Sequence, residues 1–335
     1  MKDIRDYSLL RHNTFGIEAR CSRFLEFSSI EEAQQVARIL SSSDAPFIII
    51  GGGSNLLLTK DFDGIVVHSA IRGIERVGDC RLRCGSGERW DDVVAYCVDH
   101  SLWGAENLSL IPGDVGASAV QNIGAYGAEA KDLIETIEAV EIATAKVVTI
   151  SAAECHYAYR QSRFKGEWKD RFLITHVTYR LNVGDFEPHT EYGNIMSELQ
   201  RQGISDPTAE QLRETIIDIR RQKLPDPDVL GNAGSFFMNP VVDKEKYESL
   251  AAQYPGMPHY SLPDGKEKIP AGWMIDQCGW KGRSLGRAGV HDKQALVLVN
   301  RGGATGQEVV SLCEAIRKDV LEKFGITIYP EVNII

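Results

Sequence analysis

The sequence predicts a mixed α and β fold with two or three domains, and three observations support this. The chain has 335 residues, more than one hydrophobic core usually organises. Its hydrophobic content of 43% and charged content of 25% are typical of a folded globular protein. Short apolar segments with the length of buried strands alternate with amphipathic helices that carry capping signals, and no internal repeat is evident.

The first seventy residues are predicted to form a small α/β unit. Ser29-Ile-Glu-Glu32 has the pattern of a capping box and predicts a helix that ends in the polar run 41–44. An apolar strand follows at 47–50 and runs into Gly51-Gly-Gly-Ser-Asn55. Further apolar strand segments lie at 56–58 and 64–67.

The middle of the chain is predicted to alternate hairpins with helices. Alternation predicts hairpins at 74–84 and 137–150, and periodicity predicts a helix at 90–100. Ser151-Ala-Ala-Glu154 caps a short helical turn, and 172–181 is a strand. Thr208-Ala-Glu-Gln211 opens an amphipathic helix that two prolines end after Lys223, and a domain boundary is expected at or just before this helix.

The last third is predicted to be helical with one strand. Helices are expected at 243–253 and 271–278, and a strand at 294–300. The capping box Thr305-Gly-Gln-Glu308 begins a long helix, and the chain closes on the apolar segment 326–335.

Charge and cysteine content argue against several classes of function. A formal net charge of -10 disfavours nucleic acid as a main partner, although local basic clusters suit a phosphate-bearing small molecule. The seven cysteines include no C-x-x-C pair and no histidine at zinc spacing, so no metal site is predicted and the thiols are expected to be reduced, as in the cytoplasm. No apolar run reaches the length of a membrane span, and residues 1–6 carry no signal segment, so no membrane association is expected.

Two glycine-rich segments are candidates for a phosphate site. Successive glycines in Gly51-Gly-Gly-Ser-Asn55 let backbone N–H groups converge on an anion, although a tight strand connection explains them nearly as well. The pattern is neither a Rossmann fingerprint nor a P-loop. The segment 104–127 is rich in small residues, lacks periodicity and is predicted to be a functional loop. Together the two segments suit a ligand as long as a dinucleotide.

Ser235 lies in the segment Gly231-Asn-Ala-Gly-Ser-Phe-Phe-Met-Asn-Pro240. One interpretation is a turn serine that leads into a buried strand. The other is a hydroxyl from which the two phenylalanine rings exclude water.

Other polar residues are also open to two interpretations. Arg160, in a cluster of three cations, is either a carboxylate-binding fork or part of a solvated basic face. Glu331 is either an outward-facing strand residue or a buried functional carboxylate. Tyr192 either covers a ligand or packs on its own loop. Four single polar residues lie beside turns: Lys223, Asn239, Lys281 and Gln294.

The chain resembles the UDP-N-acetylenolpyruvoylglucosamine reductase family, flavoenzymes that complete UDP-N-acetylmuramate for the bacterial cell wall. The likeness covers nearly the whole chain and is carried by nine segments in the family's order. They are Asn13-Thr-Phe-Gly16, Gly51-Gly-Gly-Ser-Asn55, Glu106-Asn-Leu-Ser-Leu-Ile-Pro-Gly113, Gln121-Asn-Ile-Gly-Ala-Tyr-Gly127, Tyr159-Arg-Gln-Ser-Arg-Phe-Lys165, Lys223-Leu-Pro-Asp-Pro227, Gly231-Asn-Ala-Gly-Ser-Phe-Phe237, Ala271-Gly-Trp-Met-Ile-Asp-Gln277 and Pro330-Glu-Val332.

The resemblance implies an α+β fold. A two-subdomain FAD-binding region of the vanillyl-alcohol-oxidase type, without a Rossmann fold, would occupy 1–70 and 71–217. A C-terminal α/β substrate domain would occupy 218–335, with the terminal strand packing back on the FAD region. Non-covalent FAD would be held by Gly51, Gly52, Gly53, Ser54, Asn55, Ile111, Pro112, Gly113, Ser118, Asn122 and Gly124.

The resemblance also implies the chemistry. NADPH would reduce the flavin, whose hydride would pass to the alkene of the enolpyruvyl ether. Arg160 and Glu331 would stabilise the resulting enolate, and Ser235 would protonate its carbon. Tyr192 is typical of the type I branch and would cover the UDP-sugar, while Lys223, Asn239, Lys281 and Gln294 would contact the substrate's diphosphate and sugar. A cytoplasmic monomer is expected.

Two positions depart from the family pattern, and two other functions remain as alternatives. Met238 and Asn333 stand where a basic residue is common, which puts any charge contact there in doubt. Many flavin-dependent oxidases of the same architecture tether the flavin through a histidine beside the glycine loop, and none lies between Gly51 and Asp63. A non-catalytic nucleotide-sugar sensor would lack one of the catalytic residues, and all three are present.

Overall fold

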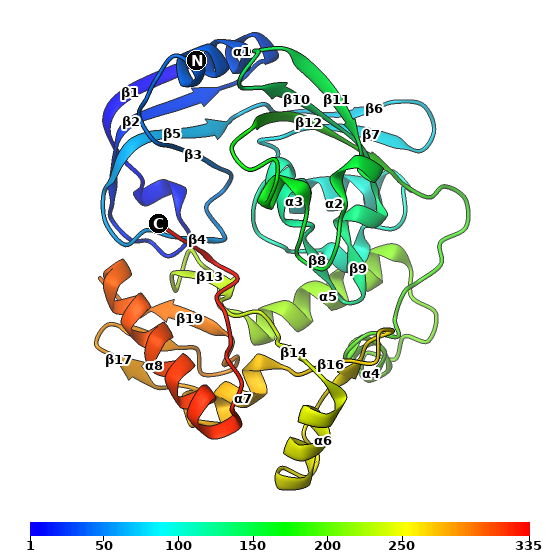
Figure 1. Cartoon of the computed structure of the whole chain (residues 1–335). Coiled ribbons are helices and arrows are strands. Elements are labelled where there is room, and N and C mark those ends of the chain that lie inside the picture. The colour runs from blue at the N-terminus through cyan, green and yellow to red at the C-terminus, as the bar shows by residue number, and fades with distance from the viewer. The chain divides into compact units, whose positions relative to one another are not determined.

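The computed structural model describes residues 1–335, which form two compact units. Unit 1 comprises Met1–Tyr7, Cys21–Gly52 and Phe62–Gln222. Unit 2 comprises Ser8–Arg20, Gly53–Asp61 and Lys223–Ile335 (Figure 1). Unit 2 therefore contains two short N-terminal segments as well as the last third of the chain. The division at 70 and 217 stays a prediction.

Unit 1 contains two sheets. The first has the order β1-β2-β5-β3, and β5 is parallel to both of its neighbours. The second is antiparallel, with the order β11-β10-β12-β7-β6. The strands are β1 (Lys2–Ser8), β2 (Arg20–Phe27), β3 (Phe47–Ile50), β5 (Phe62–Ser69), β6 (Ile74–Arg76), β7 (Arg81–Gly85), β10 (Ile134–Glu141), β11 (Val147–Ser151) and β12 (Phe172–Arg180), with a separate hairpin of β8 (Gly124–Ala125) and β9 (Ala128–Glu129).

The first helix of unit 1 packs against both sheets. Its buried face, which includes Val36 and Leu40, shares a core with Val67 of β5 and with Val140 and Leu173 of the second sheet (Figure 1). The helices of unit 1 are α1 (Ile30–Ser41), α2 (Trp90–Asp99), α3 (Val115–Gln121), α4 (Ile195–Arg201) and α5 (Ala209–Lys223), with 3-10 turns η2 (Glu106–Leu108), η3 (Ala130–Asp132), η4 (Ala152–Cys155) and η5 (Arg163–Lys165).

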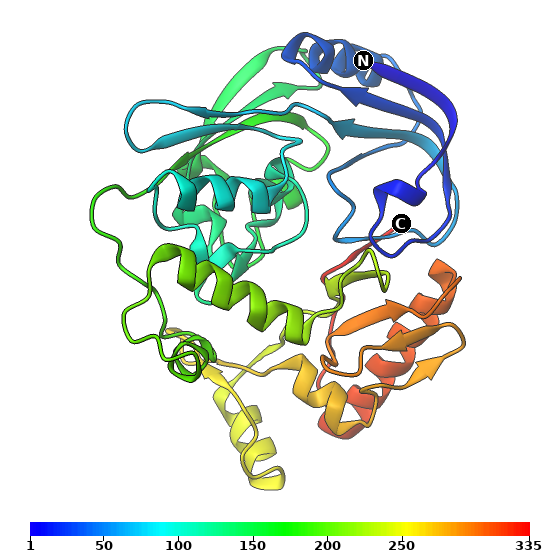
Figure 2. The ribbon, with the colours of Figure 1, turned by 180° about the vertical axis from the view of Figure 1, so that it is seen from behind.

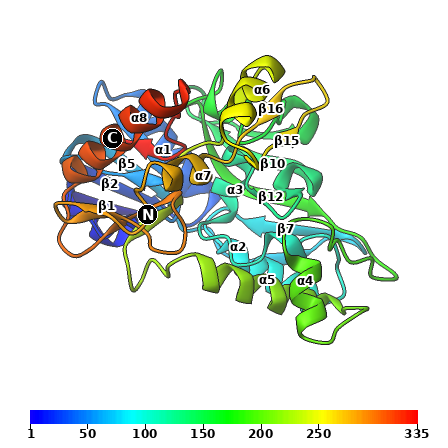
Figure 3. The same cartoon turned by 90° about the horizontal axis from the view of Figure 1, so that it is seen from below.

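A second core of unit 1 lies between α2, α3 and the antiparallel sheet. Trp90, at the start of α2, is 1% exposed; its ring packs edge-on to Tyr179 of β12. Its indole N–H donates to Leu108 O at 2.9 Å, which satisfies the polar end of the ring. α5 runs beside α2 (Figure 2 and Figure 3). Arg213 of α5 forms a 2.8 Å ion pair with Asp91 of α2.

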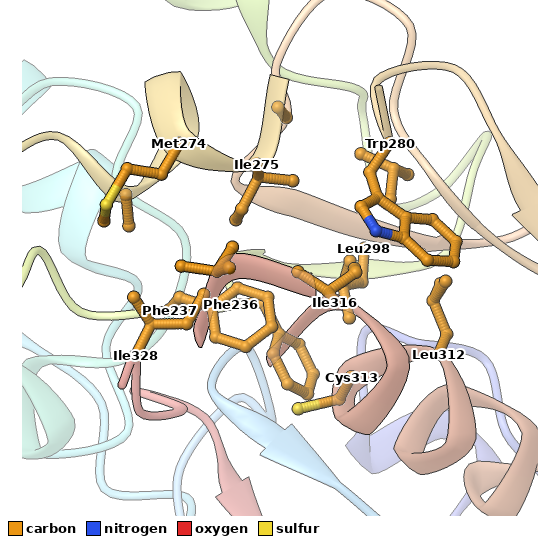
Figure 4. Close-up of a cluster of buried hydrophobic side chains, with 14 of the residues drawn as sticks. Phe236, Phe237, Met274, Ile275, Trp280, Leu298, Leu312, Cys313, Ile316 and Ile328 are labelled. Carbon is orange, nitrogen blue, oxygen red and sulfur yellow. The ribbon is translucent and has the colours of Figure 1, made fainter. Parts of the chain in front are cut away.

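Unit 2 is built on the antiparallel sheet β13-β19-β18-β17. Its core includes both phenylalanines of the Ser235 segment, which lie with Met274 and Ile275 of α7 and with Ile316 of α8 (Figure 4). The elements are β4 (Leu56–Leu57), β13 (Asn232–Ser235), β14 (Val241–Val242), β15 (Tyr260–Ser261), β16 (Glu267–Lys268), β17 (Ser284–Leu285), β18 (Ala288–Val290), β19 (Val297–Asn300), β20 (Asn333–Ile334), η1 (Leu10–His12), α6 (Lys244–Gln253), α7 (Ala271–Gln277) and α8 (Gly306–Phe324).

The segment 8–20 joins unit 2 through its motif Asn13-Thr-Phe-Gly16. The Asn13 amide donates to Leu9 O and Ile17 O, each at 2.9 Å, and its carbonyl accepts from Ile17 N at 3.0 Å. The Thr14 hydroxyl donates to Asn232 O at 2.5 Å, so the motif holds the start of β13.

The capping predictions are confirmed with one correction. Ser151 and Thr305 form complete capping boxes, and Thr208 exchanges the equivalent pair of bonds with Gln211. At α1 the Ser29 hydroxyl caps Glu32 N, but the Glu32 carboxylate bonds to Ser28 N instead of Ser29 N. The reciprocal half of the predicted box is therefore displaced by one residue.

The segment 104–127, predicted to be a functional loop without periodicity, contains regular structure. It contains η2, α3 and the strand β8. The residues of α3 are mostly small, so the helix has no long apolar period for a sequence pattern to reveal. Small residues there allow close packing: a Cβ on Gly116 would lie 3.0 Å from the Ser86 Cβ. No helix in the structure combines the length and apolar character needed to cross a membrane.

Candidate functional site

The two glycine-rich segments meet in unit 1. A Cβ on Gly51 would lie 3.1 Å from the Ala117 Cβ, and one on Gly52 would lie 3.4 Å from Gly113 Cα. The turn after β3 therefore packs directly against the start of α3, and a side chain at Gly51 or Gly52 would be crowded there. Ile111 packs beside the second core and Pro112 is exposed. This glycine-lined turn suits close approach of an elongated anionic ligand.

The remaining residues of the first glycine segment belong to unit 2. Gly53 has φ +68°, and a Cβ there would lie 2.0 Å from His12 O, so the position requires glycine. Ser54 is half-buried. The Asn55 amide donates to Glu331 O at 3.3 Å, and Asn55 O accepts from the Asn333 amide at 3.1 Å. Asn55 therefore fastens the C-terminal segment that carries Glu331.

Ser118 and Asn122, both predicted to bind the cofactor, have side chains with hydrogen-bond partners inside the protein. The Ser118 hydroxyl donates to Val115 O at 2.7 Å, lies 2.8 Å from the Tyr179 hydroxyl and is buried. The Asn122 amide donates to Glu129 at 2.8 Å and to Ala158 O at 2.9 Å, so both of its hydrogens are used. Both side chains support the local fold.

Asn122 is the centre of a polar network that holds Arg160. Asn122 is fully buried in the left-handed conformation, with φ 47°, and its side-chain oxygen accepts from Lys131 N at 2.9 Å. The Arg160 guanidinium donates to Asn122 O at 3.3 Å and to Gly124 O at 2.5 Å. Arg160 is therefore fastened to the β8–β9 hairpin and is not part of a solvated basic face.

Tyr192 packs against the same β8–β9 hairpin. A Cβ on Gly127 would be 3.3 Å from the Tyr192 ring, and Tyr192 is 43% exposed. The buried Asn107 amide donates to Tyr126 O at 2.9 Å and to His189 O at 3.0 Å, which ties the Tyr192 loop to the hairpin. Asn107 and Tyr126 lie in two of the family-like segments, but no sequence pattern distinguishes them from their neighbours.

Unit 2 brings Ser235 and Glu331 onto neighbouring segments. Residues 236–238 run antiparallel to 329–331: Glu331 N donates to Phe236 O at 2.8 Å, and Met238 N donates to Tyr329 O at 2.9 Å. Ser235 ends β13, opposite Val297 of β19. Ser235 and Glu331, the two predicted catalytic residues of unit 2, are 96 positions apart in sequence, and this strand-like pairing brings their segments together.

The expectation that the phenylalanine rings shelter the Ser235 hydroxyl is wrong. Phe236 is 0% and Phe237 1% exposed, and both rings belong to the core of unit 2 (Figure 4). Ser235 itself is exposed. Burying both rings stabilises unit 2 and leaves none to cover the hydroxyl.

Three of the predicted substrate-binding residues surround α7. The side-chain oxygen of Asn239 accepts a hydrogen bond from Ala271 N at 2.9 Å, at the start of the helix. The Gln294 carbonyl would lie 3.2 Å from a Cβ on Gly272, and Lys281 pairs with Asp276 at 3.4 Å near its other end. Lys223 is the last residue of α5. No sequence pattern predicts that Asn239, Gln294 and Lys281 lie around one helix.

Buried polar groups mark two further places in unit 1. Burial lowers the pKa of the Arg220 guanidinium, whose Nε has no hydrogen-bond partner, and burial raises the pKa of the nearby Tyr126 phenol. His68 lies between the carboxylates of Glu26 and Asp114, beside the Gly51–Gly52 turn. In the sequence, the only signal for the His68 cluster is Asp114, an acidic residue directly after Gly113.

Comparison with known proteins identifies matches to both units. Residues 226–335 match the family model described as UDP-N-acetylenolpyruvoylglucosamine reductase, C-terminal domain, and 22–151 match an FAD binding domain. The UDP-N-acetylenolpyruvoylglucosamine reductase of Bacteroides fragilis (strain YCH46) is 53% identical over 338 residues, covering 98% of this chain and 99% of the relative. That of Porphyromonas gingivalis (strain W83) is 47% identical over 340 residues, covering 99% of each.

A solved structure also shows the fold. The crystal structure of UDP-N-acetylenolpyruvylglucosamine reductase from Thermus caldophilus superposes with a TM-score of 0.69 at 20% identity, covering 99% of this chain and 98% of that one. The predicted α+β fold, an FAD-binding region followed by a C-terminal domain, is confirmed. With relatives at these identities over almost its full length, the chain belongs to the UDP-N-acetylenolpyruvoylglucosamine reductase family.

Proposed function

We propose that this FAD-binding oxidoreductase reduces the enolpyruvyl ether of UDP-N-acetylglucosamine to UDP-N-acetylmuramate, with NADPH as the reductant, as a type I member of its family. The reaction would supply peptidoglycan precursor in the cytoplasm, and the enzyme would act as a monomer. The observation that carries the proposal is the match over 98% of the chain to reductases of that name. The pairing of 236–238 with 329–331, which sets Ser235 near Glu331, supports it.

The glycine-lined turn of unit 1 fits the cofactor's diphosphate. Gly51 and Gly52 offer backbone without side chains at a place where a Cβ would already meet its neighbours, and Gly113 is one of those neighbours. When bound, FAD would accept a hydride from NADPH and pass it to the terminal alkene carbon of the substrate. The backbone at the turn would hold and orient its diphosphate, with no covalent tether.

Arg160 is proposed to bind the substrate carboxylate. Charge grows on that group as the alkene accepts hydride, so a fixed cation lowers the barrier more than it tightens substrate binding. Two carbonyl bonds to the β8–β9 hairpin hold the guanidinium in place before substrate arrives. Glu331 would share a hydrogen bond with the same carboxylate oxygens.

Ser235 is proposed to donate the proton that the enolate carbon needs. A serine hydroxyl is a weak acid, so proton donation requires a nearby cation and exclusion of water. Since Ser235 is exposed and the adjacent rings belong to the core, the substrate itself would have to exclude water. Tyr192 would cover the UDP-sugar. Lys223, Asn239, Lys281 and Gln294 would bind its diphosphate and sugar.

The first test of the reaction is NADPH oxidation that depends on the enolpyruvyl UDP-sugar. The purified protein should be yellow and should release flavin on denaturation. A colourless protein that takes up no flavin, or NADPH oxidation indifferent to the UDP-sugar, would contradict the proposed function.

Ser235→Ala separates the two half-reactions. Reduction of the flavin by NADPH should be nearly unchanged in stopped-flow measurements. Its reoxidation by the enolpyruvyl substrate should slow by roughly 100-fold to 10,000-fold, the usual contribution of a general acid. Ser249→Ala, at an exposed serine on α6, is the matched control and should change neither rate. Equal losses in both half-reactions for Ser235→Ala would remove Ser235 from proton transfer.

A further inference from the structure

We propose that His68 is a positioning residue for the diphosphate site of unit 1. Its imidazole would pair with the Asp114 carboxylate beside the Gly51–Gly52 turn and so reduce the repulsion between that carboxylate and a bound diphosphate. The inference rests on the proposed function, in which this turn holds the FAD diphosphate. It concerns residues to which the expected chemistry assigns no role.

The three groups form one chain of contacts. His68 lies near the end of β5, in register with Glu26 on β2 and with Ile50, the last residue before the glycine turn. Its Nδ1 lies 3.1 Å from Glu26 Oε2, and its Nε2 lies 3.7 Å from Asp114 Oδ2. The side chains of His68 and Glu26 are 13% exposed and that of Asp114 is 11% exposed. The imidazole therefore lies between two carboxylates with little solvent around them.

Asp114 occupies the place where a negative charge opposes the proposed ligand. Its Oδ1 would lie 3.2 Å from a Cβ on Gly52, and its Oδ2 would lie 3.5 Å from one on Gly51. A diphosphate bound against that turn would be close to the carboxylate, and like charges at short range repel strongly where water is scarce. A cation that pairs with Asp114 removes that repulsion.

The other charged group in the cluster already pairs with Glu26. Lys2 on β1 lies 2.5 Å from Glu26, while Phe24 stacks on His68 and brings no cation; Tyr7 in turn stacks on Phe24. Burial raises the pKa of Glu26, but the hydrogen bond from Lys2 and the charge of His68 outweigh it, and the pKa is lowered overall. His68 is therefore the group of this cluster that lies against Asp114.

Binding of FAD to the flavin-free full-length protein tests the coupling, with fluorescence quenching as the readout. We expect His68→Gln to bind FAD about tenfold more weakly than the parent protein, because the Asp114 carboxylate then opposes the diphosphate without its partner. Asp114→Asn should bind FAD at least as tightly as the parent protein, and the double variant should behave like Asp114→Asn. Riboflavin, which lacks the diphosphate, should bind equally well in every case.

The controls separate this inference from a general effect on folding. His259→Gln, at a histidine 3.8 Å from Glu267 in unit 2, should bind FAD as tightly as the parent protein. Weaker FAD binding by Asp114→Asn would overturn the proposal, because the carboxylate would then assist the ligand, directly or through a bound cation. Unchanged FAD affinity in His68→Gln, or an equal change for riboflavin, would also overturn it. Failure of the parent protein to bind FAD would instead contradict the proposed function.

Discussion

Two of the proposed catalytic residues are held in opposite ways. In unit 1, Arg160 is fixed by hydrogen bonds to backbone carbonyls around the buried side chain of Asn122. In unit 2, Ser235 is an exposed residue whose two successors, Phe236 and Phe237, are buried in a hydrophobic core. The cation therefore depends on a polar network, and the hydroxyl depends on apolar packing of its neighbours.

This difference follows from what each group must do. A guanidinium has five N–H donors and no acceptor. Hydrogen bonds to neutral carbonyls therefore fix its direction without neutralising its charge. A serine that donates a proton must keep its hydroxyl accessible to substrate, so the adjacent backbone must be fixed instead. Unit 2 does this with two backbone bonds to Phe236, from its N–H to Leu296 O and from Glu331 N to its carbonyl, both 2.8 Å.

Removing the apolar support should have the largest effect. Phe236→Ala should destabilise unit 2 by about 3–5 kcal/mol, since it removes a fully buried ring and leaves a cavity. Hydrogen exchange measured by mass spectrometry should show lost protection in 232–238 and in α7 and α8, with unit 1 unchanged. Substrate-dependent flavin reoxidation should fall with it, because the same core positions Ser235.

Phe236→Leu is the matched control for that change. It keeps most of the apolar volume and should cost roughly 1–1.5 kcal/mol. Equal losses of protection for the two variants, or losses that spread equally through unit 1, would contradict the view that packing in unit 2 alone supports Ser235.

Local patterns predicted much of the fold because the relevant interactions are short-range. The caps at Ser151 and Thr305 and the α5 helix that ends before Pro225 follow from contacts within a few residues. β1 was missed because Lys2–Arg5 are charged or exposed throughout and give no apolar face. α3 was missed because its residues are small.

The site was less accessible to sequence reasoning than the fold. Family-like segments supplied the identities of Ser235, Arg160 and Glu331, but the pairing of 236–238 with 329–331 is a long-range contact that no local pattern encodes. The same applies to His68 and Asp114, which are 46 positions apart. Sequence order places the two phenylalanine rings beside Ser235, which favours the sheltered interpretation. In the structure, the hydrophobic core determines where those rings point.

Removing the polar support should have an intermediate effect. Asn122→Gly keeps a residue that tolerates φ 47° and deletes only the side chain, so it isolates the network from backbone strain. Loss of the bonds to Glu129, Ala158 and Lys131 should cost about 2–3 kcal/mol, because buried carbonyl and N–H groups lose their partners. Hydrogen exchange should increase in 122–132, and flavin reoxidation by substrate should slow more than reduction by NADPH.

Asn122→Ala sharpens that experiment. It removes the same side chain but places a Cβ residue in the left-handed region, which should cost roughly a further 1 kcal/mol. If Asn122→Gly proved as stable as the parent protein, or if both half-reactions slowed equally, the network would not be the support of Arg160.

Lowering the pH should weaken the polar network that supports Arg160 and leave the apolar support of Ser235 unchanged. This is the smallest of the expected effects. Glu129 accepts from Asn122 and from Lys131, each at 2.8 Å; burial raises the pKa of its carboxyl, but these bonds outweigh it and the pKa is lowered overall. Since the folded pKa lies below the unfolded value of about 4.3, the contribution of Glu129 is fully present above that pH and is lost as pH falls through the folded pKa. The partly exposed pair should contribute under about 1 kcal/mol.

Exchange in 122–132, corrected for the intrinsic pH effect, should therefore increase below pH 4 while exchange in 232–238 does not. Glu129→Gln cannot ionise and should abolish this dependence; the same acid response in that variant would place the titrating group elsewhere.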